Sequence, residues 1–267
     1  MNLTEAEVTL LNKDSSLIVF HDHKSLLALV EKLSNSGDKN LFSVCSTRLA
    51  IAMEKSRVPH NEKARHWRAA AERAKQAGIP CSQLYSLAAD YFGRDLAHQE
   101  SAVLFEEAAS QAVSENLEKN IIRKLYQESR RQYELSGTGP DAARVFIVEN
   151  DCRLRESKGF ERIFLFLYKI LSSYGESPSR VVLSAMLLIL GCSVLYWVGG
   201  IYSSSLEEEI RSFPTSLYFS VVTFTTLGYG DYSPANSFVR VVASGQAISG
   251  LLLTSLFLVT VVRKYSR

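Results

Sequence analysis

Hydrophobic side chains are distributed very unevenly along this chain of 267 residues. Two runs near the C-terminal end, 181–202 and 241–262, contain no charged residue. Each run is long enough for a helix to cross a hydrocarbon core of roughly 30 Å, which takes about 20 apolar residues. A buried hairpin of a soluble protein is the alternative, but core helices rarely stay apolar on all faces. The pattern therefore predicts two transmembrane helices, over 181–202 and 239–262.

The preceding part of the chain, residues 1–158, has a different pattern. Alanine-rich and charged stretches such as 61–78 and 101–135 have helical spacing, and almost nothing alternates with period two. Breaks rich in Gly, Ser and Pro separate the stretches into pieces of hairpin size. We therefore predict an all-α protein in which a cytoplasmic helical domain precedes the membrane part.

Small and aromatic residues recur at helical spacing within this N-terminal domain. Ala88 and Tyr91 are followed by Phe105 and Ala108, and the stretch "AADYFGRDLAHQESAVLFEEAA" is similar to soluble NSF attachment proteins. The spacing resembles that of tetratricopeptide helix pairs, in which a ring from one helix fits over a small residue of its partner. Ordinary helix packing is the alternative. The resemblance implies a solenoid that binds a protein partner.

An amphipathic segment links this domain to the first apolar run. Phe160, Phe164 and Leu167 recur at helical spacing in 159–175, with the charged side chains on the other side. The segment is too short and too charged to span a membrane. We therefore predict an interfacial helix and linker over 159–180 that contacts membrane lipid. Packing onto the N-terminal domain is the alternative.

Basic residues near the two apolar runs predict the orientation of the chain. Both ends should be cytoplasmic by the positive-inside rule, and the first fifteen residues do not resemble a signal peptide. We therefore expect a multi-pass protein of the cell (plasma) membrane whose loop between the runs faces outward. The loop has an acidic balance, which would attract cations, although a solvated charge run is the alternative. The basic residues are Arg162, Lys169 and Arg180 before the first run, and Arg263, Lys264 and Arg267 after the second.

Composition excludes several classes of function. The net charge of +2 does not suggest a nucleic-acid partner. The four cysteines lie far apart without a C-x-x-C motif, which favours reduced thiols over disulfides or a metal site. No nucleophile, base and orienting group assemble in the sequence, so we expect neither an enzyme nor a cofactor.

The loop between the apolar runs contains a third apolar segment, "SFPTSLYFSVVTFTT" at 212–226. Its proline suits the first turn of a helix, but the predicted helix over 214–225 is too short to cross a bilayer. It must enter the membrane and return, followed by the glycine-containing sequence "LGYGD". Irregular backbone is tolerated at membrane depth where it lines an aqueous path. This segment therefore predicts a pore, and the C-terminal end of its helix would favour a cation.

The sequence "TTLGYGD" at 225–231 closely resembles the selectivity filter of potassium channels, usually T-V-G-Y-G-D. The resemblance covers the two-helix pore module, here 181–267, with the filter at 226–231. It implies a homotetramer that conducts K⁺ passively through stacked backbone carbonyls. The implied K⁺-binding residues are Thr226, Leu227, Gly228, Tyr229 and Gly230, with the carbonyls of the first four and the Thr226 hydroxyl as ligands.

Residue chemistry agrees with this assignment. Pointing successive carbonyls at one axis requires backbone dihedrals that Gly228 and Gly230 accept without a Cβ clash. Tyr229 would point outward and brace the filter. Asp231 would lie at the outer mouth, where its negative charge concentrates cations.

Farther along the chain, Gly250 stands where such pores often have a glycine hinge. Bending there would open an apolar constriction near Leu258 and Val262. Close helix packing is the alternative role for Gly250.

The sequence also departs from the usual pattern of the family. Leu227 replaces the usual valine, and Phe219 and Val222 stand where many relatives have polar side chains that brace the filter, so we expect a reduced polar network there. We expect neither an arginine-repeat voltage sensor nor a C-terminal ligand domain, and we expect regulation through the N-terminal helices or the membrane.

Two other functions stay open at this stage. A nonselective cation channel would use the same pore without discriminating K⁺ from Na⁺. A membrane-anchored interaction protein would use its tetratricopeptide-like domain and retain only a vestigial pore.

Overall fold

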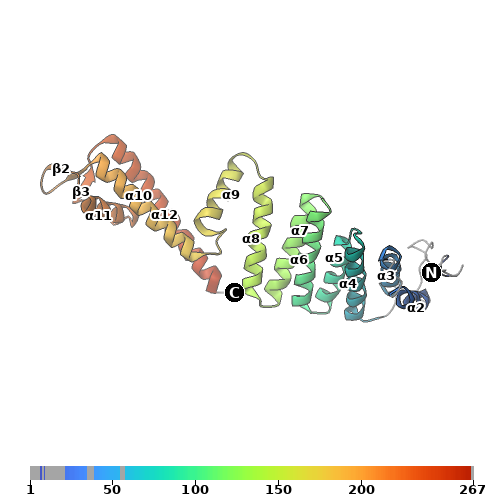
Figure 1. The fold of residues 1–267 in the computed structure, drawn as a ribbon. Coiled ribbons are helices and arrows are strands. Elements are labelled where there is room, and N and C mark those ends of the chain that lie inside the picture. The colour runs from blue at the N-terminus through green and yellow to red at the C-terminus, as the bar shows by residue number, and fades with distance from the viewer. Residues whose placement is uncertain (1–6, 8, 10–21, 35–38, 55–57, 266–267) are drawn as a thin grey trace. The chain divides into compact units, whose positions relative to one another are not determined.

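The computed structural model describes residues 7, 9, 22–34, 39–54 and 58–265. The chain divides into two compact units, Met1–Arg153 and Leu154–Arg267, which are described separately below. Helices dominate both units, as the ribbon in Figure 1 shows, and the predicted all-α fold class is confirmed.

Seven helices lie in order along the described residues of the N-terminal part of the chain. From α2 to α7, each helix packs against the next one in the sequence, and Figure 1 shows α4, α5, α6 and α7 side by side. Such packing of neighbours is the arrangement of solenoid proteins. The helices are α2 (Asp22–Ser34), α3 (Lys39–Glu54), α4 (His60–Ala77), α5 (Ser82–Arg94), α6 (His98–Ser114), α7 (Lys119–Leu135) and α8 (Gly139–Glu156).

The turns that end α4, α5, α6 and α7 share one structure. Each contains one residue with a positive φ: Gly78, Leu96, Asn116 or Gly137. The next amide then donates to a carbonyl five residues back, as in the bond of 2.9 Å from Ile79 N to Ala74 O. This is the Schellman motif, which satisfies the last carbonyls of a helix and reverses the chain. The motif recurs at these four turns and reverses the chain at each of them.

The core of this unit consists of aromatic rings packed on alanines. Ala88, Tyr91, Phe105 and Ala108 belong to one buried cluster. These are residues whose spacing suggested ring-on-alanine packing. Turns at equivalent places, such as Gly78 and Asn116, lie about 40 residues apart, whereas a tetratricopeptide repeat has about 34. The tetratricopeptide-like character of this unit therefore stays a prediction.

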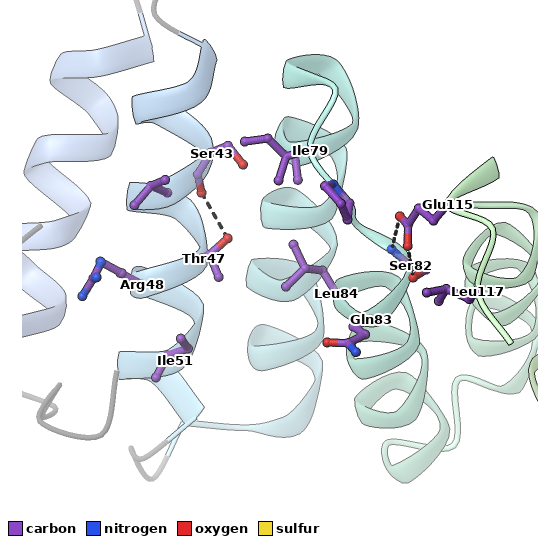
Figure 2. A pocket seen from close by; sticks show the side chains of 13 residues that line it. Ser43, Thr47, Arg48, Ile51, Ile79, Ser82, Gln83, Leu84, Glu115 and Leu117 are labelled. Carbon is purple, nitrogen blue, oxygen red and sulfur yellow. Dashed lines mark hydrogen bonds between the residues drawn. The ribbon is translucent and has the colours of Figure 1, made fainter. Parts of the chain in front are cut away.

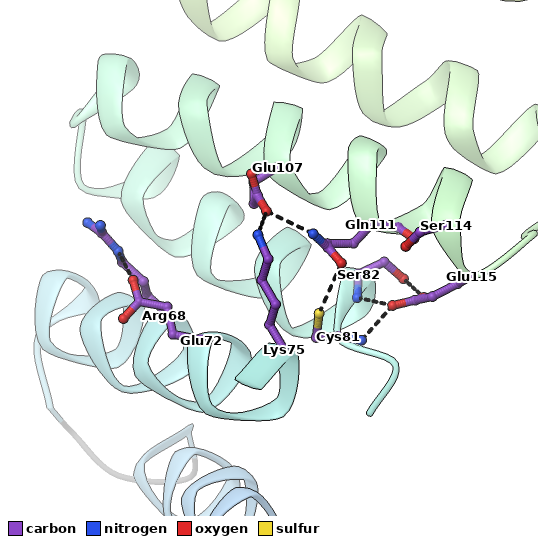
Figure 3. Close-up of polar contacts among 9 residues, drawn as sticks. All are labelled: Arg68, Glu72, Lys75, Cys81, Ser82, Glu107, Gln111, Ser114 and Glu115. Atoms are coloured by element: carbon purple, nitrogen blue, oxygen red, sulfur yellow. Dashed lines mark hydrogen bonds and ion pairs between the residues drawn. The ribbon is translucent and has the colours of Figure 1, made fainter. Parts of the chain in front are cut away.

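Polar contacts join α4, α5 and α6 (Figure 3). Glu115, next to the end of α6, accepts hydrogen bonds from the Cys81 and Ser82 amides at 2.6 and 3.0 Å. These amides lie at the start of α5 and would otherwise have no helical partner. Burial, together with the nearby Glu115 carboxylate, raises the pKa of the Cys81 thiol to about 11. The thiol is therefore neutral at physiological pH.

The C-terminal unit contains α9 (Gly159–Ser172), α10 (Pro178–Gly199), α11 (Phe213–Phe224) and α12 (Ser237–Tyr265). Helix α10 packs against the other three, and α11 also packs against α12. Helix α10 begins and ends about three residues earlier than the predicted span over 181–202. Pro178 occupies its first turn, and Gly200, with φ of 80°, ends it.

Three short strands, which the sequence pattern did not predict, join the outer ends of these helices. They are β1 (Ile201–Ser203), β2 (Glu208–Ile210) and β3 (Tyr232–Pro234), and they form an antiparallel sheet of order β2-β1-β3. Ile201 lies opposite Ile210 on one side and Pro234 on the other. Strands of three residues are too short to show an alternating pattern, which explains why they were missed.

The turn between α9 and α10 is tied to the far end of α12. Ser173, Tyr174 and Gly175 all have a positive φ, and the Tyr174 side chain is fully buried. The next residue, Glu176, pairs with Arg263 at the end of α12, with 3.0 Å between Oε1 and Nη2. This ion pair is largely buried, so it restrains the end of α12 more than a surface pair would.

Candidate ion-conduction site

Helix α11 is short and packs against both long helices, α10 and α12. Its 12 residues begin with Phe213 and Pro214, and its side chains at Phe219 and Val222 are buried. The predicted pore helix over 214–225 corresponds to α11, with each bound shifted by one residue. Helices α10 and α12, in contrast, are long and apolar enough to cross a membrane.

The backbone after α11 alternates between two conformations. Thr226, Gly228 and Gly230 have φ of 57°, 56° and 80°, whereas Leu227 and Tyr229, which lie between them, do not have a positive φ. Successive carbonyls of a β-strand point to opposite sides, whereas a backbone whose φ alternates in this way can turn them to the same side. Residues 226–230 are called the row below, because the predicted row of carbonyl oxygens would lie here.

The sequence predicted Thr226 as a ligand but did not predict its left-handed backbone, with φ of 57°. A left-handed conformation costs a residue with a Cβ about 1–3 kcal/mol, and such residues cluster at functional sites. Two hydrogen bonds hold the strained backbone on the last turn of α11, from Thr226 N to Thr223 O and from Leu227 N to Val222 O, both of 3.1 Å. A threonine in the sequence does not indicate a left-handed conformation, because β-branched residues are common in extended and helical backbone.

The outer end of the row is held by a second set of hydrogen bonds. Ser204 Oγ donates to Gly230 O at 3.0 Å, and Ser204 N donates to Asp231 O at the same distance. Tyr218 of α11 donates to Asp231 Oδ2 at 2.9 Å. The row is therefore anchored to α11 at its inner end and to the β1 loop and α11 at its outer end.

Two apolar side chains of the row lie exposed on the single chain. Leu227 is 59% exposed and Tyr229 is 68% exposed. The expectation that Tyr229 braces the filter from outside stays a prediction, because its side chain is largely exposed in the single chain.

Gly250 lies against the end of α11. A Cβ at this position would come within 2.4 Å of the Phe224 carbonyl oxygen and 3.3 Å of Phe224 Cα. The absence of a side chain therefore allows α12 to approach the backbone of α11 closely. The other two predicted gate residues, Leu258 and Val262, lie farther along α12, and both are exposed in the single chain.

A buried polar network crosses the three helices of this unit. Tyr196 Oη of α10 donates to Gln246 Oε1 of α12 at 2.6 Å. Gln246 Nε2 donates to Ser220 Oγ of α11 at 2.7 Å, and Ser220 Oγ donates to Ile189 O of α10 at 2.8 Å. The expected reduction of the polar network at Phe219 and Val222 is thus accompanied by a different network on the adjacent residue of α11. Sequence reasoning missed it because its members are 50 and 26 residues apart.

The N-terminal unit contains a groove (Figure 2). Its volume is about 440 Å³, and residues of α3 and of the start of α5 line it, including Thr47, Arg48 and Gln83. The amides at the start of α5 could bind an anion, but the Glu115 carboxylate already accepts from them. Among the described residues, no group of three His, Cys, Asp or Glu side chains could hold a metal ion. The groove therefore has no visible catalytic chemistry.

Comparison with known proteins identifies the class of the C-terminal unit. The ion-channel family matches residues 183–267. This stretch is similar to the pore domain of the ion-channel family, and the match together with the long apolar helices α10 and α12 indicates a membrane protein. No solved structure matches the chain.

The curated relatives are similar over part of the chain. A protein of Rhodopseudomonas palustris, named as a candidate potassium channel protein, is 31% identical over 121 residues, which cover 44% of this chain and 28% of the relative. A voltage-gated potassium channel regulatory subunit of Gallus gallus is 36% identical over 23% of this chain and 12% of its own length. A delayed-rectifier potassium channel regulatory subunit of Pan troglodytes is 30% identical over 30% of this chain and 16% of its own length. The chain thus spans less than a third of each relative.

Proposed function

We propose that the protein is a potassium-selective channel that conducts K⁺ passively as a homotetramer. The observation that carries this proposal is the alternating backbone of 226–230 at the end of a helix too short to span a membrane. Carbonyls aligned in this way can replace the water shell of a dehydrated K⁺ ion. The proposed ligands are the carbonyls of Thr226, Leu227, Gly228 and Tyr229 and the Thr226 hydroxyl. The potassium channels among the relatives support the choice of ion.

The homotetramer follows from the geometry of such a site. One row of carbonyls offers ligands from one side only, whereas a bare K⁺ ion needs them all round. Four copies about one axis would complete the rings and would cover the exposed Leu227 and Tyr229 side chains. Asp231 would then lie in a ring at the outer mouth and attract cations.

The inner end of the pore is proposed to form the gate. In a tetramer, the apolar Leu258 and Val262 side chains of four α12 helices could close an aqueous path by dewetting. Gly250 is the proposed hinge above them. Its close contact with Phe224 supports the alternative role in helix packing equally well, so the two roles need the separate test given below.

We propose a plasma-membrane location with both termini in the cytoplasm, because basic residues flank the two spans on the same side. Helix α9 would then lie on the cytoplasmic leaflet. Its exposed apolar side chains support this placement: Phe160 is 82% exposed, and Phe164 and Leu167 are also largely exposed. The N-terminal helices would modulate the channel by binding a protein partner, as solenoid surfaces commonly do. Pull-down with residues 1–158, followed by flux with the captured partner added, tests this role.

Ion flux in liposomes tests the main proposal. Purified protein should release K⁺ from loaded vesicles much faster than Na⁺, and Ba²⁺ should block the release, while empty vesicles should show neither effect. Equal rates for K⁺ and Na⁺ would instead support a nonselective cation channel. The absence of any flux from a correctly assembled protein would support the membrane-anchored interaction protein.

A further inference from the structure

We propose that Gln246 is a positioning residue for the filter, and that it acts by fixing the pore helix α11 through Ser220. This inference rests on the proposed function, because it concerns selectivity among cations. It assigns a role in conduction to a buried residue of α12 that contacts no ion.

The network around Gln246 forms a closed circuit between helices. Its bonds run from Tyr196 of α10 to Gln246 of α12, from there to Ser220 of α11, and back to Ile189 of α10. Gln246 Nε2 also donates to the Ser220 carbonyl at 3.1 Å. Each of the three helices is therefore bonded to both of the others by this one circuit.

The orientation of the Gln246 amide is dictated by its partners. A serine hydroxyl has one hydrogen, and Ser220 donates it to the Ile189 carbonyl, so its oxygen must accept from the Gln246 NH₂ group. The amide oxygen then faces Tyr196, whose phenol donates to it. The Ser220 carbonyl can only accept, so reversing the amide would place the Gln246 oxygen against another acceptor. The NH₂ group of Gln246 therefore faces Ser220.

Burial makes each hydrogen bond of this network costly to lose. Tyr196 and Ser220 are fully buried, and Gln246 is 2% exposed. A group that lost its partner here could not turn to water, which makes a partly broken network costly. The Tyr196 ring also packs edge-on against Phe219, with 4.9 Å between centroids. Ser220 and Phe219 thus hold adjacent positions of α11 against the two spans.

The filter follows α11 directly in the chain, so a shift of α11 also shifts the start of the filter. Leu227 N bonds to Val222 O, two residues beyond Ser220, so the first filter carbonyls follow any movement of this helix. The side chains of Phe219 and Val222 cannot form hydrogen bonds that would hold α11 near the filter. The hydrogen bonds of Gln246 hold α11 instead, and Gln246 belongs to α12, the proposed gating helix. A displacement of α12 would therefore reach the filter through this bond.

The test compares Gln246→Leu with the matched control Ser193→Ala. Ser193 is also fully buried and donates to the same Ile189 carbonyl, at 2.6 Å, but it lies on α10 itself and joins no second helix. K⁺ and Na⁺ flux are measured in liposomes for both full-length variants, together with the thermal stability of the purified assembly. Gln246→Leu should lower the K⁺ to Na⁺ permeability ratio by about fivefold or more. Ser193→Ala should leave the ratio unchanged.

A third variant separates positioning from stability. The triple substitution Tyr196→Phe, Ser220→Ala and Gln246→Leu removes every member and leaves none unsatisfied, so thermal stability should return toward that of the parent. Selectivity should stay low, because the helices have lost the bonds that align them. Recovery of selectivity together with stability would overturn the proposal, as would a Gln246→Leu variant with the parent ratio.

The remaining outcomes are also decisive. If Gln246→Leu does not assemble, Tyr196→Phe carries the same comparison, since it removes one oxygen atom and keeps the ring, and an unchanged ratio in that variant would count against the circuit. A parent protein without selectivity would refute the proposed potassium channel itself. A selective parent whose variants keep their selectivity would refute only the role of Gln246.

Discussion

Gly228 and Gly230 are required because of their backbone conformation, and not because a side chain would collide with neighbouring atoms. Both have a positive φ, yet a Cβ at either position would meet no heavy atom within 4 Å in the single chain. The cost of an alanine is therefore the left-handed conformation, about 1–2 kcal/mol per residue. A filter that relaxes to avoid this cost loses the alignment of its carbonyls.

We expect Gly228→Ala and Gly230→Ala to abolish selective K⁺ flux in liposomes for this reason. Gly191→Ala is the matched control, because Gly191 lies in α10 with equally open space around a Cβ and without a positive φ. The control should conduct like the parent. Selective flux through the Gly228→Ala protein would contradict the assignment of the filter.

At the scale of elements, α12 has two contacts with α11 that differ in kind. Gln246 bonds to Ser220, and Gly250 faces the Phe224 carbonyl without a side chain between them. Packing and hinge roles for Gly250 predict different results of one substitution. An alanine would collide with backbone, which cannot move aside as a flexible side chain can.

If Gly250 serves packing, Gly250→Ala should lower the thermal stability of the purified assembly by about 1–3 kcal/mol, as overpacking does. Gly245→Ala on the same helix places its new Cβ with no neighbour within 4 Å, so it should leave the thermal stability unchanged. Differential scanning fluorimetry of the two variants measures this difference. A Gly250→Ala protein of unchanged stability but altered open probability would favour the hinge.

Helix α9 has exposed apolar side chains that either membrane lipid or another part of the protein could cover. An interfacial location predicts that a fluorescent label on Phe164→Cys is quenched by a lipid-soluble agent, and one on Arg162→Cys by a water-soluble agent. The measurement uses the protein in vesicles. Equal quenching of both labels by the water-soluble agent would favour packing onto another part of the protein.

At the scale of the whole molecule, the two units have different tasks in the proposed channel. The pore unit needs other copies to complete its site, whereas the N-terminal unit buries its own aromatic and alanine core. We expect native mass spectrometry of the detergent-solubilised protein to give four times the chain mass of 29.8 kDa. A stable monomer or dimer would be incompatible with rings of carbonyls around K⁺.

The class of the pore and the location of its parts along the chain could be predicted from the sequence. Two uncharged runs, a short apolar segment between them and the G-Y-G sequence are local patterns, and local patterns can be read along one chain. The alanines and aromatic rings of the N-terminal helices indicated their packing partners for the same reason. The strands β1, β2 and β3 were missed because each is shorter than the window in which a pattern shows.

The contacts that hold the filter, in contrast, could not be predicted from the sequence. The left-handed Thr226, the contact of Gly250 with Phe224 and the circuit through Tyr196, Gln246 and Ser220 depend on residues brought together from three helices. A serine, a glutamine and a tyrosine far apart in sequence carry no sign of their bonds. Their roles arise from burial, which forces each polar group to find a partner, and burial is a property of the folded chain.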